Sequence, residues 1–515
     1  MLLIFPPIAK ACEPPAGIAR LAGTLRTNGV RCRLWDANLE GQLWLLEQLP
    51  PVDDTWTGRA WRSRQRHLQG LREPALYGNP SRYSTAINDL NRLLQVAGRP
   101  FHADITLADF HHGELSPVRS KDLLWAAAHP EISPFYPFFQ ERLPDLMEGI
   151  SSVGISICFL SQALCGFTLI GLIRRKYPQV KIVLGGGLVT SWLARPDWRN
   201  PFGNLVDLMI GGPGEQPLLE LLGCDHPHKT AIPDYSRLPL QDYLSPGLIL
   251  PYSASSGCWW NRCSFCPERA EGNRYLPLPT SRVLEELRHL TSQYQPRLIH
   301  LLDNAISPAV LMGLIQHPPG ATWYGFVRFI PQLADIEFCR ALRQSGCVML
   351  KLGIESGDRT VLDRLNKGIE LEQAGRILEN LNRAGIAVYG YLLFGTPAED
   401  EAAARRTMQF VLRYHESITF LNLAIFNMPL FCDEVAEYET ELFYDGDLSL
   451  YTGFRHPEGW GRGEVRRFLR NVFCKAPEIA AIIRRDPPFF SSNHAALSAV
   501  SGLSHLFSTV TSESQ

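Results

Sequence analysis

Strand-like and helix-like segments alternate between residues 248 and 430, and this alternation limits the folds that are open to the chain. Short apolar runs predict strands at residues 247–252, 297–302, 322–326, 347–352, 388–394 and 418–425. Helical periodicity separates most of them, at residues 281–294, 336–345, 371–384 and 399–414. This order predicts parallel strands in a barrel-like α/β fold. Six units fall short of a closed eight-stranded barrel, so we expect a partial (β/α) barrel.

A second alternating region lies at the amino-terminal end. Its predicted strands are residues 2–5, 30–35, 153–159, 180–184 and 205–210. This pattern predicts a Rossmann-like domain, in which ligands bind at the carboxyl ends of the strands. A chain of 515 residues has room for two or three domains. We expect this domain at residues 1–225 with a helical insertion at about 42–148, a linker at 226–247, the barrel at 248–432, and a mainly helical region with a disordered tail at 433–515.

Composition excludes some functions. A net charge of −2 gives no sign of nucleic-acid binding. The twelve cysteines are mostly scattered, which is typical of a reducing cytoplasm, and the amino terminus lacks the basic region of a signal peptide. Residues 149–173 carry no charge and are long enough to suggest a membrane span. Their serines, Gln162 and internal glycines instead favour a buried strand and the helix that follows it, so we expect no membrane span.

Three of the cysteines, Cys258, Cys263 and Cys266, fall within nine residues, on a loop that follows a predicted strand. Thiols grouped this closely bind a metal or form a disulfide. Three is an odd number for disulfides, and a structural zinc site would need a fourth ligand. Three thiolates suit an iron–sulfur cluster with one iron left open, which makes a cluster the favoured reading over zinc or a buried trio.

This loop resembles that of the radical S-adenosylmethionine (SAM) enzymes, whose pattern is CxxxCxxC with an aromatic residue before the last cysteine. Phe265 precedes Cys266 here, but four residues rather than three separate Cys258 from Cys263. The resemblance implies a [4Fe-4S] cluster held by the three cysteines. It also implies a partial barrel of six units, in agreement with the strand count.

Downstream motifs resemble the elongator-type subgroup of that family. They are Leu352-Gly-Ile-Glu-Ser-Gly357, Leu365-Asn-Lys-Gly368 and Gly395-Thr-Pro397. The resemblance implies that Glu355 and Ser356 contact SAM, together with Gly353 and Gly395. A carboxylate at a strand end also suits ribose hydroxyls. Arg328 is a candidate for the SAM carboxylate, since arginine pairs with carboxylates through two hydrogen bonds.

The amino-terminal half resembles the cobalamin-binding domain that precedes many radical SAM domains. Asp36, Asn38 and Gly41 match the frame of its DxHxxG motif, with asparagine in place of the cobalt-binding histidine. The resemblance therefore implies cobalamin bound without a protein imidazole below the cobalt. Further matches follow later predicted strands, at Gly185, Gly186 and Gly187 and at Gly214 and Glu215. Tight packing and a plain loop are the structural alternatives.

Taken together, the resemblances imply a cytoplasmic, cobalamin-dependent radical SAM enzyme. It would cleave SAM reductively to a 5′-deoxyadenosyl radical and transfer a methyl group to an unactivated carbon or phosphorus centre. Its partners would be a small-molecule or peptide substrate and an electron donor such as flavodoxin or ferredoxin. The main alternative is a cobalamin-assisted cyclisation, rearrangement or oxidation without methyl transfer. An RNA methylthiotransferase is disfavoured because a second cysteine trio and a basic tail are absent. The motifs after Cys266 argue against a non-enzymatic binding module.

Overall fold

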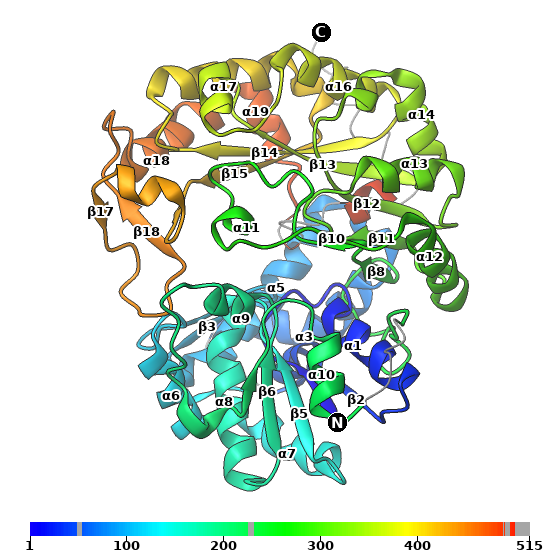
Figure 1. The fold of residues 1–515 in the computed structure, drawn as a ribbon, viewed down its shortest axis with the longest axis vertical. Helices are drawn as coiled ribbons and strands as arrows, with labels where there is room; N and C mark the ends of the chain where they lie inside the picture. Colours follow the sequence, from blue (N-terminus) through cyan, green and yellow to red (C-terminus); the bar gives the residue numbers. More distant parts are fainter. Residues whose placement is uncertain (49–53, 225–230, 488, 490–494, 500–515) are drawn as a thin grey trace. The chain divides into compact units, whose positions relative to one another are not determined.

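The computed structural model describes residues 1–48, 54–224, 231–487, 489 and 495–499. The chain forms two compact units, each built around its own parallel sheet (Figure 1). Unit 1 comprises Met1–Leu248 and Tyr444–Leu450, and unit 2 comprises Ile249–Phe443 with the chain after Leu450. The predicted α/β fold class is confirmed. The predicted disordered tail lies outside the described residues.

Unit 1 contains a five-stranded parallel sheet in the order β2-β1-β5-β6-β7. The strands are β1 (Leu2–Phe5), β2 (Arg33–Asp36), β5 (Ser152–Ser156), β6 (Lys181–Gly185) and β7 (Leu208–Met209). Strand order reverses next to β1, and this switch point is where doubly wound sheets bind ligands. Its helices are α1 (Ala16–Thr27), α8 (Leu160–Lys176), α9 (Gly187–Leu193) and α10 (Glu215–Leu221).

The uncharged stretch at residues 149–173 forms β5 and most of α8, as predicted. Helix α8 is buried from Gln162 to Ile173, which explains why it is apolar on every side. It packs against α6 (Ser120–Ala128). Among the described residues, no helix is long and apolar enough to cross a membrane.

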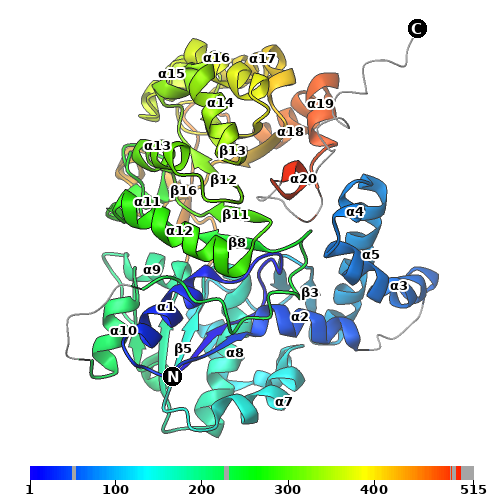
Figure 2. The same ribbon diagram turned by 90° about the vertical axis from the view of Figure 1, so that its right-hand side faces the viewer.

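The region between β2 and β5 is mainly helical. It begins with α2 (Ala37–Glu47) and continues through α3 (Thr55–Leu71), α4 (Pro74–Tyr77) and α5 (Pro80–Gly98). Helices α3, α4 and α5 are the group of blue helices in Figure 2. A short hairpin of β3 (Ala103–Ile105) and β4 (Phe110–His112) follows, and then α6 and α7 (Tyr136–Met147). Helices α3 and α5 pack closely together, with the buried His67 ring 3.0 Å from the Asp89 carboxylate.

Unit 2 contains six parallel strands in sequence order, β8 to β15, as the partial-barrel prediction requires. They are β8 (Ile249–Tyr252), β11 (Leu298–Leu301), β12 (Thr322–Val327), β13 (Cys347–Glu355), β14 (Ala387–Phe394) and β15 (Phe420–Ile425). The connecting helices are α12 (Thr280–Tyr294), α13 (Pro308–Gln316), α14 (Ile336–Gln344), α15 (Arg359–Arg364), α16 (Leu371–Arg383) and α17 (Glu401–Arg413).

The carboxyl-terminal part of unit 2 adds strands that the sequence did not predict. Strands β16 (Met428–Pro429), β17 (Thr440–Glu441) and β18 (Tyr451–Phe454) form a small antiparallel sheet. The predicted helices follow as α18 (Arg462–Asn471) and α19 (Pro477–Ile483), and α20 (Ala495–Ala499) contacts β13.

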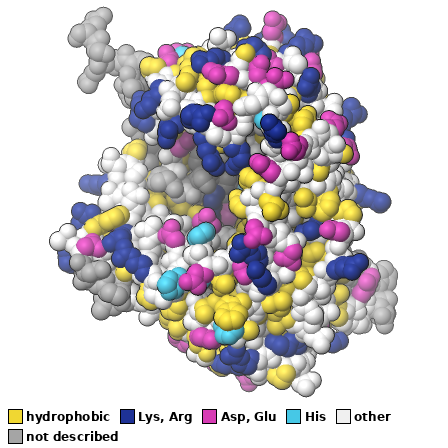
Figure 3. Space-filling model, turned by 90° about the vertical axis from the view of Figure 1, so that its left-hand side faces the viewer, with side chains coloured by type: hydrophobic (Ala, Val, Ile, Leu, Met, Phe, Trp, Pro, Cys, Tyr) yellow, Lys and Arg dark blue, Asp and Glu magenta, His cyan; other side chains and the backbone are white. Residues whose placement is uncertain are grey.

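Charged side chains of both signs are interspersed over the face shown in Figure 3. This distribution accords with the net charge of −2.

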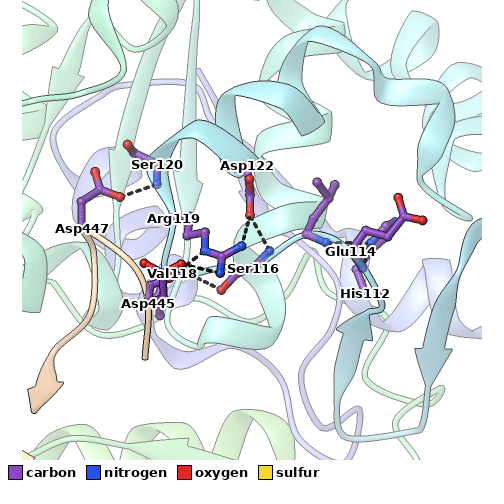
Figure 4. A network of polar contacts seen from close by, with 10 residues as sticks. His112, Glu114, Ser116, Val118, Arg119, Ser120, Asp122, Asp445 and Asp447 are labelled. Carbon is purple, nitrogen blue, oxygen red and sulfur yellow. Dashed lines mark hydrogen bonds and ion pairs between the residues drawn. The ribbon is translucent and has the colours of Figure 1, made fainter. Parts of the chain in front are cut away.

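Residues 444–450 form a strap that leaves unit 2 and packs within unit 1. Arg119 pairs with Asp445 at 2.8 Å, and the Ser120 amide donates to Asp447 at 2.8 Å (Figure 4). Leu448 is 1% exposed, and its amide donates to the Val118 carbonyl. The strap is therefore held by a backbone hydrogen bond, an ion pair and the buried side chain of Leu448 together.

We predict that Gly446→Ala loosens the strap. An added Cβ would lie 2.1 Å from the Val118 carbonyl oxygen, which is backbone and yields little. Overpacking of this kind costs about 1–3 kcal/mol, and cleavage of a locally opened segment tracks that free energy. Chymotryptic cleavage near Leu448 should accelerate about tenfold. Gly463→Ala, where the nearest atom is the end of the Arg467 side chain at 3.7 Å, should leave the rate unchanged. Equal rates for both variants would contradict the proposed anchoring.

Candidate cofactor sites

The cysteine loop starts at the carboxyl end of β8. Strand β9 (Ser255–Ser256) pairs with β10 (Leu276–Pro277) and closes the base of the loop. Asp303, which follows β11, accepts hydrogen bonds from the Ala254 amide and the Ser255 hydroxyl. It is 3% exposed, and burial raises the pKa of its carboxyl. Asp303 therefore positions the loop.

The three cysteines differ in their surroundings. Cys263 is buried, whereas Cys258 and Cys266 are half-buried. Burial raises the pKa of the Cys266 thiol to about 11. Cys266 precedes α11 (Pro267–Ala270), a single short turn. In the described part of the chain, no three His, Cys, Asp or Glu side chains lie close enough together to hold a metal ion.

Arg328, just after β12, connects the cysteine loop to a second loop. Its Nη1 lies 3.7 Å from Cys263 Sγ, and its guanidinium lies 4.0 Å from the centre of the Trp260 ring. Its Nη2 donates to the Lys367 carbonyl oxygen. A guanidinium favours a neighbouring thiolate. Three thiols on one loop, with this cation beside the buried one, are the type of donor that an iron–sulfur cluster needs, but in the described residues they are not gathered around one point.

Glu355, at the end of β13, pairs with Lys367 at 2.6 Å, and both side chains are only about a tenth exposed. Glu355 has φ of +60°, a conformation that costs a non-glycine residue energy and that often marks a functional site. Gly353 leaves room for the pair, because a Cβ there would lie 2.3 Å from the Glu355 carboxylate and 2.6 Å from Lys367 Nζ. Gly353 and Glu355, both predicted to contact SAM, therefore lie side by side, and Lys367 lies next to both of them.

The side chain of Ser356 points into the interior of unit 2. It is fully buried, and its hydroxyl lies 3.1 Å from that of Thr407 and accepts from the Asp358 amide. Gly395, with φ of +77°, starts the turn after β14, and its amide donates to Glu399. Glu399 is fully buried and also accepts from Trp460 Nε1. Burial raises the pKa of its carboxyl to about 7, against the opposing effect of these two donors.

In unit 1, Asp36, Asn38 and Gly41 lie at the start of α2. Asp36 caps the helix by accepting from the Leu39 amide and also accepts from the Tyr243 hydroxyl at 2.6 Å. Asn38 Oδ1 accepts from the Ala9 amide at 2.7 Å. A Cβ on Gly41 would lie 3.2 Å from the Phe135 ring. All three motif residues therefore make contacts within the protein in this structure.

The glycines after β6 lie at the carboxyl edge of the same sheet. Gly186, with φ of +105°, packs against the Ile157 backbone, where a Cβ would lie 2.4 Å from the carbonyl oxygen. Gly187 is exposed, and its nearest contact would be the Cys158 carbonyl at 3.7 Å. Phe159, after β5, is 55% exposed. Gly214 caps α10, whose first residue is the half-buried Glu215. Gly187 and Phe159 thus leave an open position and an exposed ring at this edge of the sheet.

Sequence reasoning missed several residues of these sites. Lys367 stood inside a motif that carried the resemblance, but no pattern indicated its pairing with Glu355. Trp260 lay between the cysteines, and its role as a platform for Arg328 needs the fold. Glu399 lies four residues after Gly395, and only its buried hydrogen bonds with Gly395 and Trp460 connect it to this turn.

Part of unit 2 matches a known protein family. Residues 252–411 match the model of the Radical SAM superfamily. The match begins at the end of β8 and contains the cysteine loop, Arg328, Glu355 and Lys367.

Several curated relatives share part of the chain. An uncharacterized methyltransferase of Pyrococcus horikoshii is 26% identical over 35% of this chain and 40% of its own length. Bacteriochlorophyllide d C-12(1)-methyltransferase of Chlorobaculum tepidum is 26% identical over 32% and 38%. Anaerobic magnesium-protoporphyrin IX monomethyl ester cyclase of Rubrivivax gelatinosus is 23% identical over 52% and 50%. The chain thus spans half or less of the length of each of these relatives.

Similarity of fold extends much further than similarity of sequence. The radical SAM methyltransferase TsrM of Kitasatospora setae, solved with tryptophan substrate and a SAM analogue, aligns over 94% of this chain and 89% of its own. The TM-score is 0.54 at 15% identity. A second structure of TsrM, with cobalamin and a [4Fe-4S] cluster, aligns over 84% and 75% with a TM-score of 0.50 at 17% identity. Residues 252–411 are therefore a radical SAM domain, in a chain that shares its overall fold with a radical SAM methyltransferase.

Proposed function

We propose that this chain is a cobalamin-dependent radical SAM enzyme that transfers a methyl group to an unactivated carbon or phosphorus centre of a small molecule or peptide. The observation that carries the proposal is the Radical SAM match at residues 252–411, which encloses the cysteine loop and the Arg328 and Glu355–Lys367 contacts. The similarity in fold to TsrM and the methyltransferases among the relatives support it.

In this proposal, Cys258, Cys263 and Cys266 hold a [4Fe-4S] cluster. When bound, the cluster supplies the electron for reductive cleavage of SAM, and cobalamin supplies the methyl group. Arg328 stabilises the thiolate of Cys263 and binds the carboxylate of SAM. The Glu355 carboxylate accepts hydrogen bonds from the ribose hydroxyls, and its pair with Lys367 holds it in place. Ser356 and Gly395 shape the neighbouring turns.

Cobalamin is proposed to lie at the carboxyl edge of the sheet in unit 1, over Gly185, Gly186 and Gly187, with Gly214 and Glu215 at its margin. Asn38 is buried and hydrogen-bonded to Ala9, so it holds the turn under the ligand instead of reaching the cobalt. Asp36 and Gly41 support the same turn. This arrangement supports binding without a protein ligand below the cobalt. We place the enzyme in the cytoplasm, with flavodoxin or ferredoxin as electron donor.

A second candidate function is a cobalamin-assisted cyclisation without methyl transfer. It is favoured by the relative from Rubrivivax gelatinosus, which is a cyclase and matches 52% of this chain. The two functions separate in an anaerobic assay with SAM carrying a labelled methyl group. Label in the product supports methyl transfer, and an unlabelled, modified product supports cyclisation.

We predict that Cys263→Ala abolishes both the iron–sulfur absorbance of the reconstituted protein and the formation of 5′-deoxyadenosine from SAM. A cluster with only two thiolates is poorly held. Cys32→Ala removes a half-buried thiol from unit 1 and serves as the matched control. Loss of cluster in both variants, or in neither, would contradict the assignment of the ligands.

Glu355→Gln should weaken SAM binding at least tenfold while the cluster content stays the same. The neutral amide leaves the Lys367 ammonium without its ionic partner, at a cost of about 3–5 kcal/mol for a buried pair. Equilibrium dialysis with labelled SAM measures the affinity. Glu337→Gln breaks the exposed pair with Arg340 and should change nothing. Unaltered SAM binding by Glu355→Gln would remove this residue from the site.

Gly187→Val should abolish retention of hydroxocobalamin through gel filtration. The added side chain occupies the space over the glycine turn, and the nearest contact of 3.7 Å leaves the fold intact. An unchanged melting temperature checks that point. Gly463→Val, on α18, is the control and should retain cobalamin as the wild type does. Retention by Gly187→Val would place the cobalamin elsewhere.

A further inference from the structure

The segment between β18 and α18 lies outside the residues that match the Radical SAM model, but it contacts a turn of that domain. The match ends at residue 411, and the segment covers residues 455–461. The turn follows β14 and contains Gly395 and Thr396. Gly395 has φ of +77°, and a Cβ there would lie 3.2 Å from the Val465 side chain of α18. The carboxyl-terminal part of unit 2 therefore packs directly on this turn.

His456 joins the turn to the segment through both nitrogens of its ring. Its Nε2 lies 2.9 Å from the Thr396 carbonyl oxygen, which can only accept, so Nε2 carries a proton. Its Nδ1 accepts from the amides of Glu458 and Trp460, each at 3.2 Å. His456 is 7% exposed, and burial lowers the pKa of its imidazole. The ring is therefore neutral and ties the backbone of the turn to that of the segment.

Trp460 reaches the same turn through Glu399. Its Nε1 donates to Glu399 Oε2 at 3.0 Å, and this oxygen also accepts from the Gly395 amide. The Trp460 ring lies edge-on to Phe468 of α18, with ring centroids 5.7 Å apart, which fixes the direction of the indole donor. The Glu399 amide donates to the Thr396 carbonyl at 2.9 Å. One buried carboxyl thus connects the start of the turn to the carboxyl-terminal segment.

The second oxygen of Glu399, Oε1, is buried and has no hydrogen-bond partner within the part of the chain that the structure describes. An ionised carboxylate with an unpaired buried oxygen costs free energy. Burial raises the pKa of this carboxyl to about 7, and the carboxylates of Asp400 and Asp358 act in the same direction. Asp358 is itself paired with Arg406, and the neutral His456 offers no compensating charge. A proton on Oε1 removes the unpaired charge and leaves Oε2 to accept both hydrogen bonds.

We propose that Trp460 and His456 are positioning residues for SAM, which hold the Gly395 turn in the conformation that contacts the cofactor. The inference rests on the proposed function, because it takes Gly395 as a contact of SAM. Neither side chain touches SAM: His456 acts through the backbone of Thr396, and Trp460 acts through Glu399. The segment at residues 455–461 is therefore part of the machinery that binds the cofactor, although it lies outside the matched domain.

The protonated carboxyl of Glu399 gives this arrangement a pH dependence. Its pKa is higher in the folded turn, at about 7, than its ordinary value of 4.5. Its contribution to the stability of the turn is therefore complete below the ordinary pKa and is lost as the pH rises through about 7. SAM binding should weaken over the same rise in pH.

The first test compares Trp460→Phe and His456→Phe with the wild type, in reconstituted protein kept anaerobic. Phenylalanine keeps a ring at each position and removes the hydrogen bonds. Equilibrium dialysis with labelled SAM should show an affinity lower by about fivefold or more. Hydrogen–deuterium exchange of residues 394–399 should accelerate in both variants. Trp125→Phe, which removes an indole that is 52% exposed in unit 1, should change neither quantity.

The second test uses Glu399→Gln, which has the shape of the protonated carboxyl and cannot ionise. Between about pH 6 and about pH 8.5, the wild type should lose about threefold more SAM affinity than Glu399→Gln does. Titration of the SAM amino group affects both proteins alike. Glu337→Gln, which changes an exposed ion pair, should follow the wild type. An effect on packing alone would not alter this pH profile.

The outcomes separate the inference from the proposed function. Equal SAM affinity of Trp460→Phe and the wild type overturns the inference, and so does the same pH dependence in Glu399→Gln. Weaker binding without faster exchange of the turn overturns it as well, because the variant would then act elsewhere. If His456→Phe does not fold, Trp460→Phe still decides the matter. A wild type that binds no SAM, with a turn that exchanges faster in Trp460→Phe, refutes the proposed function instead.

Discussion

Contacts of one guanidinium hold the candidate site of unit 2 together. Arg328 leaves the end of β12 and reaches the thiol of Cys263, the ring of Trp260 and the carbonyl of Lys367. It therefore fixes the cysteine loop against the loop that carries the lysine partner of Glu355. The Ser264 amide and the Trp260 indole also donate to the Leu365 and Asn366 carbonyls of that second loop, and Asp303 fixes the base of the cysteine loop.

The site combines rigid and strained parts in a way that suits reversible binding of a charged cofactor. Strand ends provide fixed positions, and Glu355 has a backbone conformation that costs free energy and is held by the surrounding contacts. Arg328 lies beside the thiol of Cys263 and also binds the carbonyl of Lys367, whose ammonium pairs with Glu355. This mixture of charges supports the proposal that SAM binds here, because SAM itself carries charges of both signs.

Much of this arrangement was predictable from the sequence. The alternation of strands and helices determines both parallel sheets, because buried parallel strands read as short apolar runs and their connections are helical. The cysteines were singled out by their grouping along the chain, and Glu355 by the resemblance of its motif to a known family. Long-range contacts were not predictable: the Glu355–Lys367 pair and the hydrogen bond between Asn38 and the Ala9 amide join residues from different segments of the chain. A helical insertion was predicted between β2 and β5, but its individual helices were not, and the small sheet of β16 to β18 was not predicted because its strands are too short to show periodicity.

The strap has a consequence for how the protein is made. Residues 444–450 supply the last piece of unit 1, whereas the rest of that unit ends at Leu248. Ribosomes synthesise the chain from the amino terminus, so unit 1 waits for almost two hundred further residues before its surface around Val118 and Arg119 is covered. The barrel unit is translated during that interval. The order of synthesis therefore couples completion of the first unit to production of the second, and dividing the gene at Leu248 would deprive the first product of its own final segment.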